Sequence, residues 1–341
     1  MRNGGTNGSG PTVLTIGTFD GVHIGHQALV RSARAIADGA PGARVVALVF
    51  DPNPLTVIRP EAAPATLSSF VQRSAWLEAA GADEVVRLEP TRELLSESPE
   101  AFVDRTVAQL RPIAFVEGDD FHFGRARSGT NAVLAELGRS RGFKVEVVPP
   151  VTVALSDNQI APARSTMVRW LLSGGRVRDA AIVLGRPYEL GGAVVQGDRR
   201  GRTIGFPTAN IRVGTMVPAD GVYAAAATLP DGRELCAALS IGSKPTFGEG
   251  ARAVEAFLMR PGSRGAAWST IDGLPEYGWT LKLRVIAWVR EQVRFHSLEA
   301  LLDQMERDCD RCEEIVRCTG GPGAVCSGSK AGQATAKGAI A

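Results

Sequence analysis

The stretch TVLTIGTFDGVHIGHQALVRSARAIAD, residues 12–38, carries the pattern that decides the fold. Its first six residues form an apolar, β-branched run that ends at Gly17, and its last fourteen repeat apolar residues at helical spacing. The turn between them follows a strand, and open α/β sheets bind ligands at the carboxyl ends of their strands. Two of the four histidines, His23 and His26, lie in this turn on either side of Gly25. The stretch therefore predicts both a parallel sheet and a ligand site.

The first half of the chain repeats this alternation of strand and helix. Continuous apolar runs separated by helices are typical of a parallel sheet that is covered on both faces. We therefore expect a doubly wound α/β domain over residues 12–184, closed by short helices near 166–172 and 177–184. The further apolar runs lie at 43–50, 83–90, 113–120 and 144–151, and the helical patterns at 25–38, 68–80, 99–110 and 131–140.

From Gly185 onward the pattern changes to short β-like runs separated by turn residues. Several short strands in succession favour a small antiparallel barrel, because closure leaves no exposed sheet edge. An amphipathic pattern over 297–317, with Ser297 as N-cap, predicts a helix packed on this barrel. We expect a barrel domain over 185–318, a flexible N-terminus over 1–11 and a disordered tail over 319–341. The six runs lie at 191–198, 208–213, 221–229, 234–242, 253–259 and 280–289.

Composition narrows the function classes. The chain has 341 residues, of which 44% are hydrophobic and 22% are charged, and its net charge is +2. No polybasic tract suggests nucleic acid as a partner, and the longest apolar run, 45–50, is too short to span a bilayer. The first ten residues lack the apolar core of a signal peptide, so we expect a cytoplasmic protein without nucleic-acid or membrane partners. A weak homo-oligomer stays open.

Two of the five cysteines, Cys309 and Cys312, have the spacing of a zinc or redox pair. They also continue an apolar stripe at helical spacing with Leu298, Leu301, Leu302, Met305 and Val316. We favour buried small side chains over a metal site, because the stripe explains both cysteines.

The histidine turn suits a nucleotide phosphate. His23 and His26 lie on one face of the first helical turn, where free backbone N–H groups and the helix dipole favour negative charge. Gly25 presents no side chain between them. Two imidazoles can stabilise charge that develops on an α-phosphate during in-line displacement. The competing interpretation is that both histidines only cap the helix or lie at the surface.

A second set of chemical residues lies in GDRRGRTIGFPTAN, residues 197–210. Thr208 and Asn210 are two apart in a predicted strand, so their side chains project from one face. A hydroxyl and an amide oxygen suit Mg²⁺, which takes few protein ligands and keeps substrate phosphates as others. Gly201 and Gly205 let the loop fold closely over a nucleotide. Without further support, PTAN also fits a surface hairpin with a proline-led strand.

The motifs resemble those of the bacterial bifunctional riboflavin kinase and FMN adenylyltransferase family. GTFDGVHIGH resembles the HxGH signature of nucleotidylyltransferases, VEGDDFHFGRARSG its flavin-side loop, RSTMVRWLL its second phosphate motif, and PTAN the Mg-ATP motif of riboflavin kinases. The resemblance spans 12–317 and implies a Rossmann-like nucleotidylyltransferase domain followed by a kinase barrel. It implies Mg²⁺ as cofactor, and ATP, riboflavin and FMN as substrates.

The resemblance also assigns roles to residues of this sequence. The catalytic candidates are His23, His26 and Glu255, with Glu255 as the base that activates the riboflavin 5′-hydroxyl. Thr208 and Asn210 are the candidate metal ligands. The candidate ATP and phosphate contacts are Gly17, Phe19, Gly25, Asn53, Ser165, Thr166, Arg169, Gly201, Arg202 and Gly205, and the flavin contacts are Asp120, Phe121, Phe123 and Arg290.

Several positions depart from the family pattern. Asn53 replaces a histidine, and Arg164 a serine, near the predicted phosphate site. Ser240 replaces an asparagine and Phe257 a histidine in the barrel, and residues 260–274 depart most. Two alternatives therefore stay open: a riboflavin kinase whose first half has lost adenylyl transfer, and a flavin or nucleotide sensor without turnover. A sensor has no need of a base such as Glu255.

Overall fold

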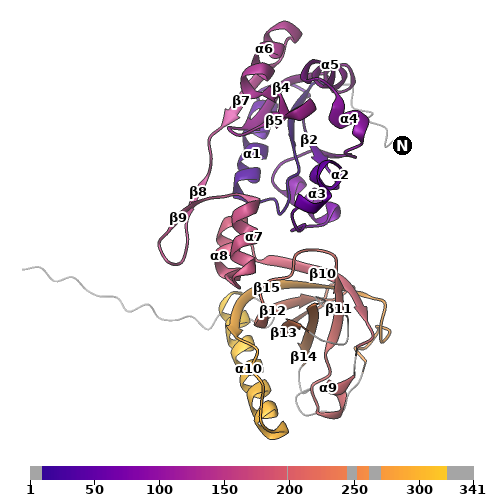
Figure 1. Cartoon of the computed structure of the whole chain (residues 1–341), viewed down its shortest axis with the longest axis vertical. Helices are drawn as coiled ribbons and strands as arrows, with labels where there is room; N and C mark the ends of the chain where they lie inside the picture. The colour runs from indigo at the N-terminus through magenta and orange to yellow at the C-terminus, as the bar shows by residue number, and fades with distance from the viewer. Residues whose placement is uncertain (1–9, 198, 244–251, 261–269, 321–341) are drawn as a thin grey trace, which may run out of the picture.

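The structure, a computed structural model, describes residues 10–197, 199–243, 252–260 and 270–320. An α/β half and a β-barrel half lie end to end along the long axis of the molecule (Figure 1). Most of the predicted flexible N-terminus and of the predicted tail lies outside the described residues, as do 261–269 of the divergent segment.

The first half contains a five-stranded parallel sheet in the order β3-β2-β1-β4-β7. Residues that alternate along a strand face opposite sides, so Val13 packs in the core beneath α1 and α3, and Leu14 in the core beneath α5 and α6. This arrangement confirms the predicted doubly wound sheet. Its strands are β1 (Thr12–Gly17), β2 (Arg44–Phe50), β3 (Glu84–Leu88), β4 (Pro112–Gly118) and β7 (Lys144–Val148), and its main helices α1 (Ile24–Asp38), α3 (Phe70–Ala79), α5 (Pro99–Leu110) and α6 (Asn131–Arg141).

Smaller elements decorate this frame, and the apolar pattern does not predict them. Their residues are mostly polar or exposed, so no buried stripe marks them in the sequence. The hairpin of β8 and β9 follows the edge strand β7 and leads into α7 (Ser165–Ser173) (Figure 1). They are α2 (Leu55–Ile58), η1 (Pro60–Ala62), α4 (Arg92–Ser96), β5 (His122–Phe123), η2 (Arg125–Arg127), β6 (Gly129–Thr130), β8 (Thr152–Ala154) and β9 (Ile160–Pro162).

The second half is a closed antiparallel barrel in the order β10-β11-β14-β13-β12-β15. Six strands and one long C-terminal helix were expected, and both are confirmed. Ser297 caps α10 by accepting a hydrogen bond from the Ala300 N–H at 3.1 Å. The strands are β10 (Tyr188–Val195), β11 (Ala209–Val213), β12 (Gly221–Thr228), β13 (Glu234–Ser243), β14 (Arg252–Met259) and β15 (Thr280–Arg290), and the helices α9 (Arg200–Thr203) and α10 (Leu298–Cys318).

Strand alternation divides the barrel residues between two cores. Val254 and Ala256 face the interior, whereas Phe257 faces the outer core against α10. The interior core continues into α7 (Ser165–Ser173) and α8 (Val177–Leu184), which lie between the sheet and the barrel. These two helices therefore share a core with the barrel although they precede residue 185, and the division at 184 stays a prediction.

Cys309 and Cys312 lie in the outer core of the barrel and are 2% and 0% exposed. Neither forms a disulfide, and the described residues hold no group of three or more His, Cys, Asp or Glu that could bind a metal ion. The prediction of buried small side chains is confirmed. None of the helices described here combines the length and the apolar character of a membrane span.

Candidate active sites

The histidine turn joins β1 to α1 at the carboxyl edge of the sheet. His23 is the N-cap of α1, and its Nδ1 accepts a hydrogen bond from the His26 N–H at 3.3 Å. The two imidazole rings stack with centroids 3.6 Å apart. The capping interpretation is therefore correct for His23, but the stacked pair also presents two imidazoles together, as a phosphate site requires.

Burial keeps both imidazoles neutral. Desolvation, followed by the charges of Arg186 and Arg164, lowers the pKa of His23 to about 3. Desolvation, followed by His23 and Arg186, also holds the pKa of His26 well below its usual value. Among the described residues, His26 Nδ1 is buried without a hydrogen-bond partner. A neutral imidazole carries one N–H donor, so the pair can donate hydrogen bonds without carrying charge of its own.

Glycines and an aromatic ring fix this turn from beneath. Phe19 is 1% exposed, and its ring meets the edge of His26 with centroids 5.1 Å apart. A Cβ on Gly17 would lie 3.3 Å from the Phe19 ring, and one on Gly25 would lie 3.0 Å from the Ala163 carbonyl oxygen. Phe19, predicted as an ATP contact, is therefore a core residue that supports His26.

The second predicted phosphate motif lies beside the turn, at the start of α7. Ser165 Oγ donates a hydrogen bond to the Asp20 carbonyl at 2.8 Å, and the exposed Thr166 follows it. Arg169 forms an ion pair with the Asp20 carboxylate at 2.5 Å and donates to the Ala65 carbonyl at 2.7 Å. The structure thus brings the two motifs together, with Arg169 held on Asp20.

Two arginines at this edge, the partly buried Arg186 and the buried Arg73, carry no motif in the sequence. Arg186 donates to the Gly21 carbonyl at 2.6 Å and lies 3.5 Å above the Trp76 ring, and burial lowers its pKa to about 10. Arg73 donates to the Thr18 carbonyl at 2.7 Å and forms an ion pair with Asp51. The only sequence signal for Arg73 was its place within the predicted helix over 68–80.

Two of the departures from the family pattern, Asn53 and Arg164, lie at the same edge of the sheet. Asn53 Oδ1 accepts a hydrogen bond from the Leu55 N–H at 2.9 Å, which commits its oxygen to a local turn. Arg164 lies 3.6 Å from the Asp120 carboxylate in an exposed ion pair. Arg164 therefore links the flavin-side loop to the second phosphate motif, and its charge also reaches His23.

The flavin-side loop divides between surface and core. The Asp120 side chain is 70% exposed, whereas Phe123 is 8% exposed and belongs to the core beneath α5 and α6. Phe121 stacks on Phe123 with centroids 5.4 Å apart. Asp120 and Phe121 are therefore accessible candidates for a flavin, and Phe123 supports Phe121 from within.

In the barrel, strand register places the kinase candidates side by side. Asn210 on β11 lies opposite Glu255 on β14, and Glu255 lies opposite Ser240 on β13. Thr208 directly precedes β11. A Cβ on Gly197 would overlap the side-chain amide of Asn210, so the glycine-rich loop lies directly against this residue.

The same loop is tightly folded. A Cβ on Gly201 would overlap the Phe206 carbonyl, and Gly205 has a φ of +81°, which favours glycine. Arg202, a predicted ATP contact, forms an ion pair with Glu276 and donates to the Tyr277 hydroxyl at 3.0 Å.

Arg290, the weakest of the predicted flavin contacts, is held by α10. Its guanidinium makes hydrogen bonds of 2.7 to 3.0 Å to the Asp308 carboxylate, whose side chain is 7% exposed. Arg290 therefore fastens α10 to the barrel, and no flavin contact follows from its position. Gln292, which the motifs did not indicate, donates to Ser240 Oγ at 3.0 Å beside Glu255.

Comparison with known proteins identifies a family for each half of the chain. The FAD synthetase family matches residues 6–161, and the riboflavin kinase family matches residues 184–316. A bifunctional riboflavin kinase/FMN adenylyltransferase from Listeria monocytogenes is 34% identical over 304 residues, covering 87% of this chain and 90% of the relative. The chain belongs to the bifunctional riboflavin kinase/FMN adenylyltransferase family.

Other relatives extend over the same part of the chain. The family member from Pseudomonas fluorescens is 35% identical over 301 residues, covering 87% of this chain and 90% of the relative. The crystal structure of a macrolide-efflux protein from Streptococcus pneumoniae has the same architecture, with a TM-score of 0.77 and 26% identity over 89% of this chain and 94% of that chain. The two folding units of this family therefore occur here in the same order.

Proposed function

We propose that the barrel phosphorylates riboflavin to FMN and that the α/β half then transfers AMP from ATP to FMN, which gives FAD and pyrophosphate. The observation that carries the proposal is that each folding unit assembles its own site. The α/β half presents stacked His23 and His26 beside α7, and the barrel aligns Asn210 with Glu255. Family membership supports both steps.

The barrel site offers hard oxygen donors and a base. The Thr208 hydroxyl and the Asn210 amide oxygen fit Mg²⁺, because this ion prefers oxygen ligands and keeps several water and phosphate ligands. The fit rests on Gly197, which lies so close to the Asn210 amide that a Cβ there would overlap it. When bound, Mg²⁺ neutralises charge on the ATP phosphates.

Glu255 then acts as the general base of the kinase step. Its carboxylate takes the proton from the 5′-hydroxyl of riboflavin, and the oxygen attacks the γ-phosphorus while ADP leaves. The register that places Glu255 between Asn210 and Ser240 puts this base beside the metal ligand. Transfer of the phosphoryl group from ATP to riboflavin needs the base and the metal ligand close together, since this reaction depends mainly on positioning and charge stabilisation.

In the α/β half, a phosphate oxygen of FMN attacks the α-phosphorus of ATP and pyrophosphate leaves. His23 and His26 donate hydrogen bonds to the α-phosphate oxygens, where negative charge increases in the transition state. Ser165, Thr166 and the N–H groups at the start of α7 receive the pyrophosphate. Arg169 contributes from its place on Asp20, because the ion pair fixes its guanidinium beside Ser165.

A two-product assay tests this function against both alternatives. We expect purified protein with riboflavin, ATP and Mg²⁺ to form FMN first and FAD second. FMN without FAD would instead support a kinase whose α/β half is inactive, as Asn53 and Arg164 allow. Tight FMN binding without release of ADP or pyrophosphate would identify a sensor.

Two substitutions separate the sites within one chain. We expect His26→Ala to abolish FAD formation and to spare FMN formation, because His26 lies only in the α/β site. Glu255→Gln should abolish FMN formation and spare FAD formation when FMN is supplied. Loss of both activities after either change in folded protein would contradict the division into two sites.

A further inference from the structure

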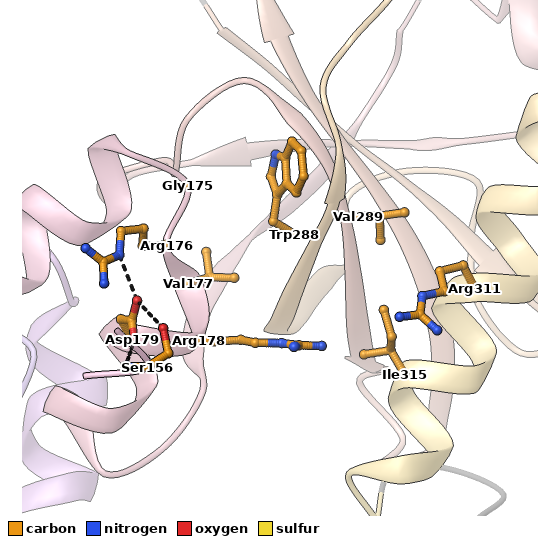
Figure 2. Close-up of a pocket in the computed structure, with 10 residues that line it drawn as sticks. All are labelled: Ser156, Gly175, Arg176, Val177, Arg178, Asp179, Trp288, Val289, Arg311 and Ile315. Carbon is orange, nitrogen blue, oxygen red and sulfur yellow. Dashed lines mark hydrogen bonds and ion pairs between the residues drawn. The ribbon is translucent and has the colours of Figure 1, made fainter. Parts of the chain in front are cut away.

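A polar cavity lies away from both candidate active sites, where α8, β15 and α10 meet (Figure 2). Its volume is about 370 Å³, within the range of small-molecule sites. Strand β15 does not pair with β11 or β14, which carry Asn210 and Glu255. Neither proposed reaction uses the residues that line it.

One wall of the cavity is the indole of Trp288, which is 43% exposed. Two glycines fix its pyrrole edge: a Cβ on Gly221 would lie 2.7 Å from Nε1, and one on Gly175 would lie 3.5 Å from Cδ1. The indole therefore has a fixed orientation while much of its surface remains bare. A rigid, exposed aromatic face is suited to stacking with a planar ring.

Two arginines face the cavity from opposite sides. Arg178 extends from α8 across the cavity toward α10, and Arg311 approaches from α10 (Figure 2). Arg178 has no hydrogen bond or ion pair with any described residue. Arg311 pairs with Glu314 at 2.5 Å, but both side chains are more than half exposed, so this pair costs little to exchange.

The single carboxylate in the lining is already satisfied. Asp179 accepts hydrogen bonds from the Ser156 N–H at 2.8 Å and from Arg176 Nε at 2.7 Å. Because these contacts hold Asp179 on the side of the β8–β9 turn, it does not neutralise Arg178. The open part of the cavity therefore combines an aromatic face with two guanidinium groups.

From this combination we infer a third ligand site, which binds a nucleotide by stacking its ring on Trp288 and by placing its phosphate between Arg178 and Arg311. Guanidinium groups bind phosphate through paired, charge-assisted hydrogen bonds, and the ring adds a contact that a free phosphate lacks. A flavin mononucleotide and an adenine nucleotide share this chemistry. The site stands on its own residues and does not depend on turnover at either active site.

Fluorine NMR on protein labelled with 5-fluorotryptophan tests the inference. The chain has five tryptophans, and Trp288→Phe assigns one resonance to position 288. We titrate FMN, ADP and inorganic phosphate separately. The test variant is Arg178→Glu with Arg311→Gln, because a glutamate in the first turn of α8 suits the helix dipole and keeps the fold. Arg31→Glu, an exposed arginine on α1, is the matched control.

We expect FMN or ADP to shift the Trp288 resonance to saturation in the wild-type protein and in Arg31→Glu, and the double variant to bind about tenfold more weakly or worse. A lower midpoint for FMN identifies a flavin ligand, and a lower midpoint for ADP an adenine nucleotide. No shift with either nucleotide, an equal shift in the double variant, or the same midpoint with phosphate alone would overturn the inference. The two-product assay reports separately on the proposed reactions.

Discussion

At the scale of single residues, the two sites depend on side chains that their surroundings hold in one state. His23 and His26 are neutral because the turn buries them, and their imidazole rings stack on each other. The Asn210 amide lies against Gly197, where the Cβ of any other residue would overlap it. Small changes at these positions should therefore affect one reaction at a time.

Gly197→Ala tests the fit of the loop against Asn210. The new Cβ would overlap the Asn210 amide, so the loop or the metal ligand must shift. Displacement by about 1 Å costs about 100-fold in rate, and we expect that loss in kcat/KM for ATP in the kinase reaction.

Gly214→Ala is the matched control for this change. A Cβ at Gly214 meets nothing within 4 Å, so both activities should stay near the wild-type values. Equal kinase rates for Gly197→Ala and the wild type, measured with riboflavin and ATP, would show that Asn210 is not held by this loop.

Burial of His23 should make the fold sensitive to acid. Its pKa is about 3 in the folded protein and about 6.5 when unfolded, so only the unfolded chain takes up this proton between those values. The free energy of unfolding should therefore be unaffected by His23 above pH 6.5 and fall as the pH decreases below it. At pH 5 the loss from His23 is about 2 kcal/mol.

Urea unfolding at several pH values measures this loss. His23→Asn keeps an acceptor for the His26 N–H and removes the titrating group, so its stability should decline less between pH 7 and pH 5. An unchanged pH dependence in this variant would show that His23 is not the buried group responsible.

At the scale of elements, α10 is held to the barrel by one apolar face and by Asp308. Val316 is fully buried against the barrel, whereas Leu298 at the other end of the helix is 55% exposed. The predicted apolar stripe is therefore buried toward the end of the helix, whereas its first residue, Leu298, is largely exposed.

Val316→Ala should lower the free energy of unfolding by about 2 kcal/mol, because it removes buried methyl groups and leaves a cavity. Leu298→Ala should change it by less than about 0.5 kcal/mol, since this side chain is largely solvated. Denaturant unfolding of both variants gives the comparison. Equal losses would mean that α10 packs through a different face.

At the scale of the whole molecule, the two halves are joined through buried contacts. The Tyr188 hydroxyl lies 3.0 Å from the Leu67 carbonyl oxygen and 2.7 Å from the Met216 carbonyl oxygen, which share its one proton, and Gln72 donates to Glu189 at 2.8 Å. Leu67 also belongs to the core shared by α7, α8 and the barrel. The halves should therefore not unfold independently.

Tyr188→Phe removes the one proton that the Leu67 and Met216 carbonyls share. We expect a loss of about 1 kcal/mol and a lower midpoint for thermal loss of both activities together. Val71→Ala on α3, whose side chain is 76% exposed, is the control. Loss of only one activity on heating would show that the two halves are energetically separate.

The sequence by itself determined the two folding units and most residues of the two candidate sites. Continuous apolar runs predicted the parallel sheet, short spaced runs predicted the barrel, and the motifs indicated the histidine turn and PTAN, because these signals repeat over neighbouring residues. A weak homo-oligomer and a cytoplasmic location stay predictions.

Only the tertiary structure decided which side chains meet across the fold. It placed Phe19 and Phe123 in the core, assigned Arg290 to Asp308 and Arg169 to Asp20, and brought Arg73 and Arg186 to the carboxyl edge of the sheet. The cavity at Trp288 likewise forms from three separate elements. The burial of a side chain and its pairing with a distant residue depend on packing between segments that are far apart in the sequence. Local periodicity therefore does not predict them.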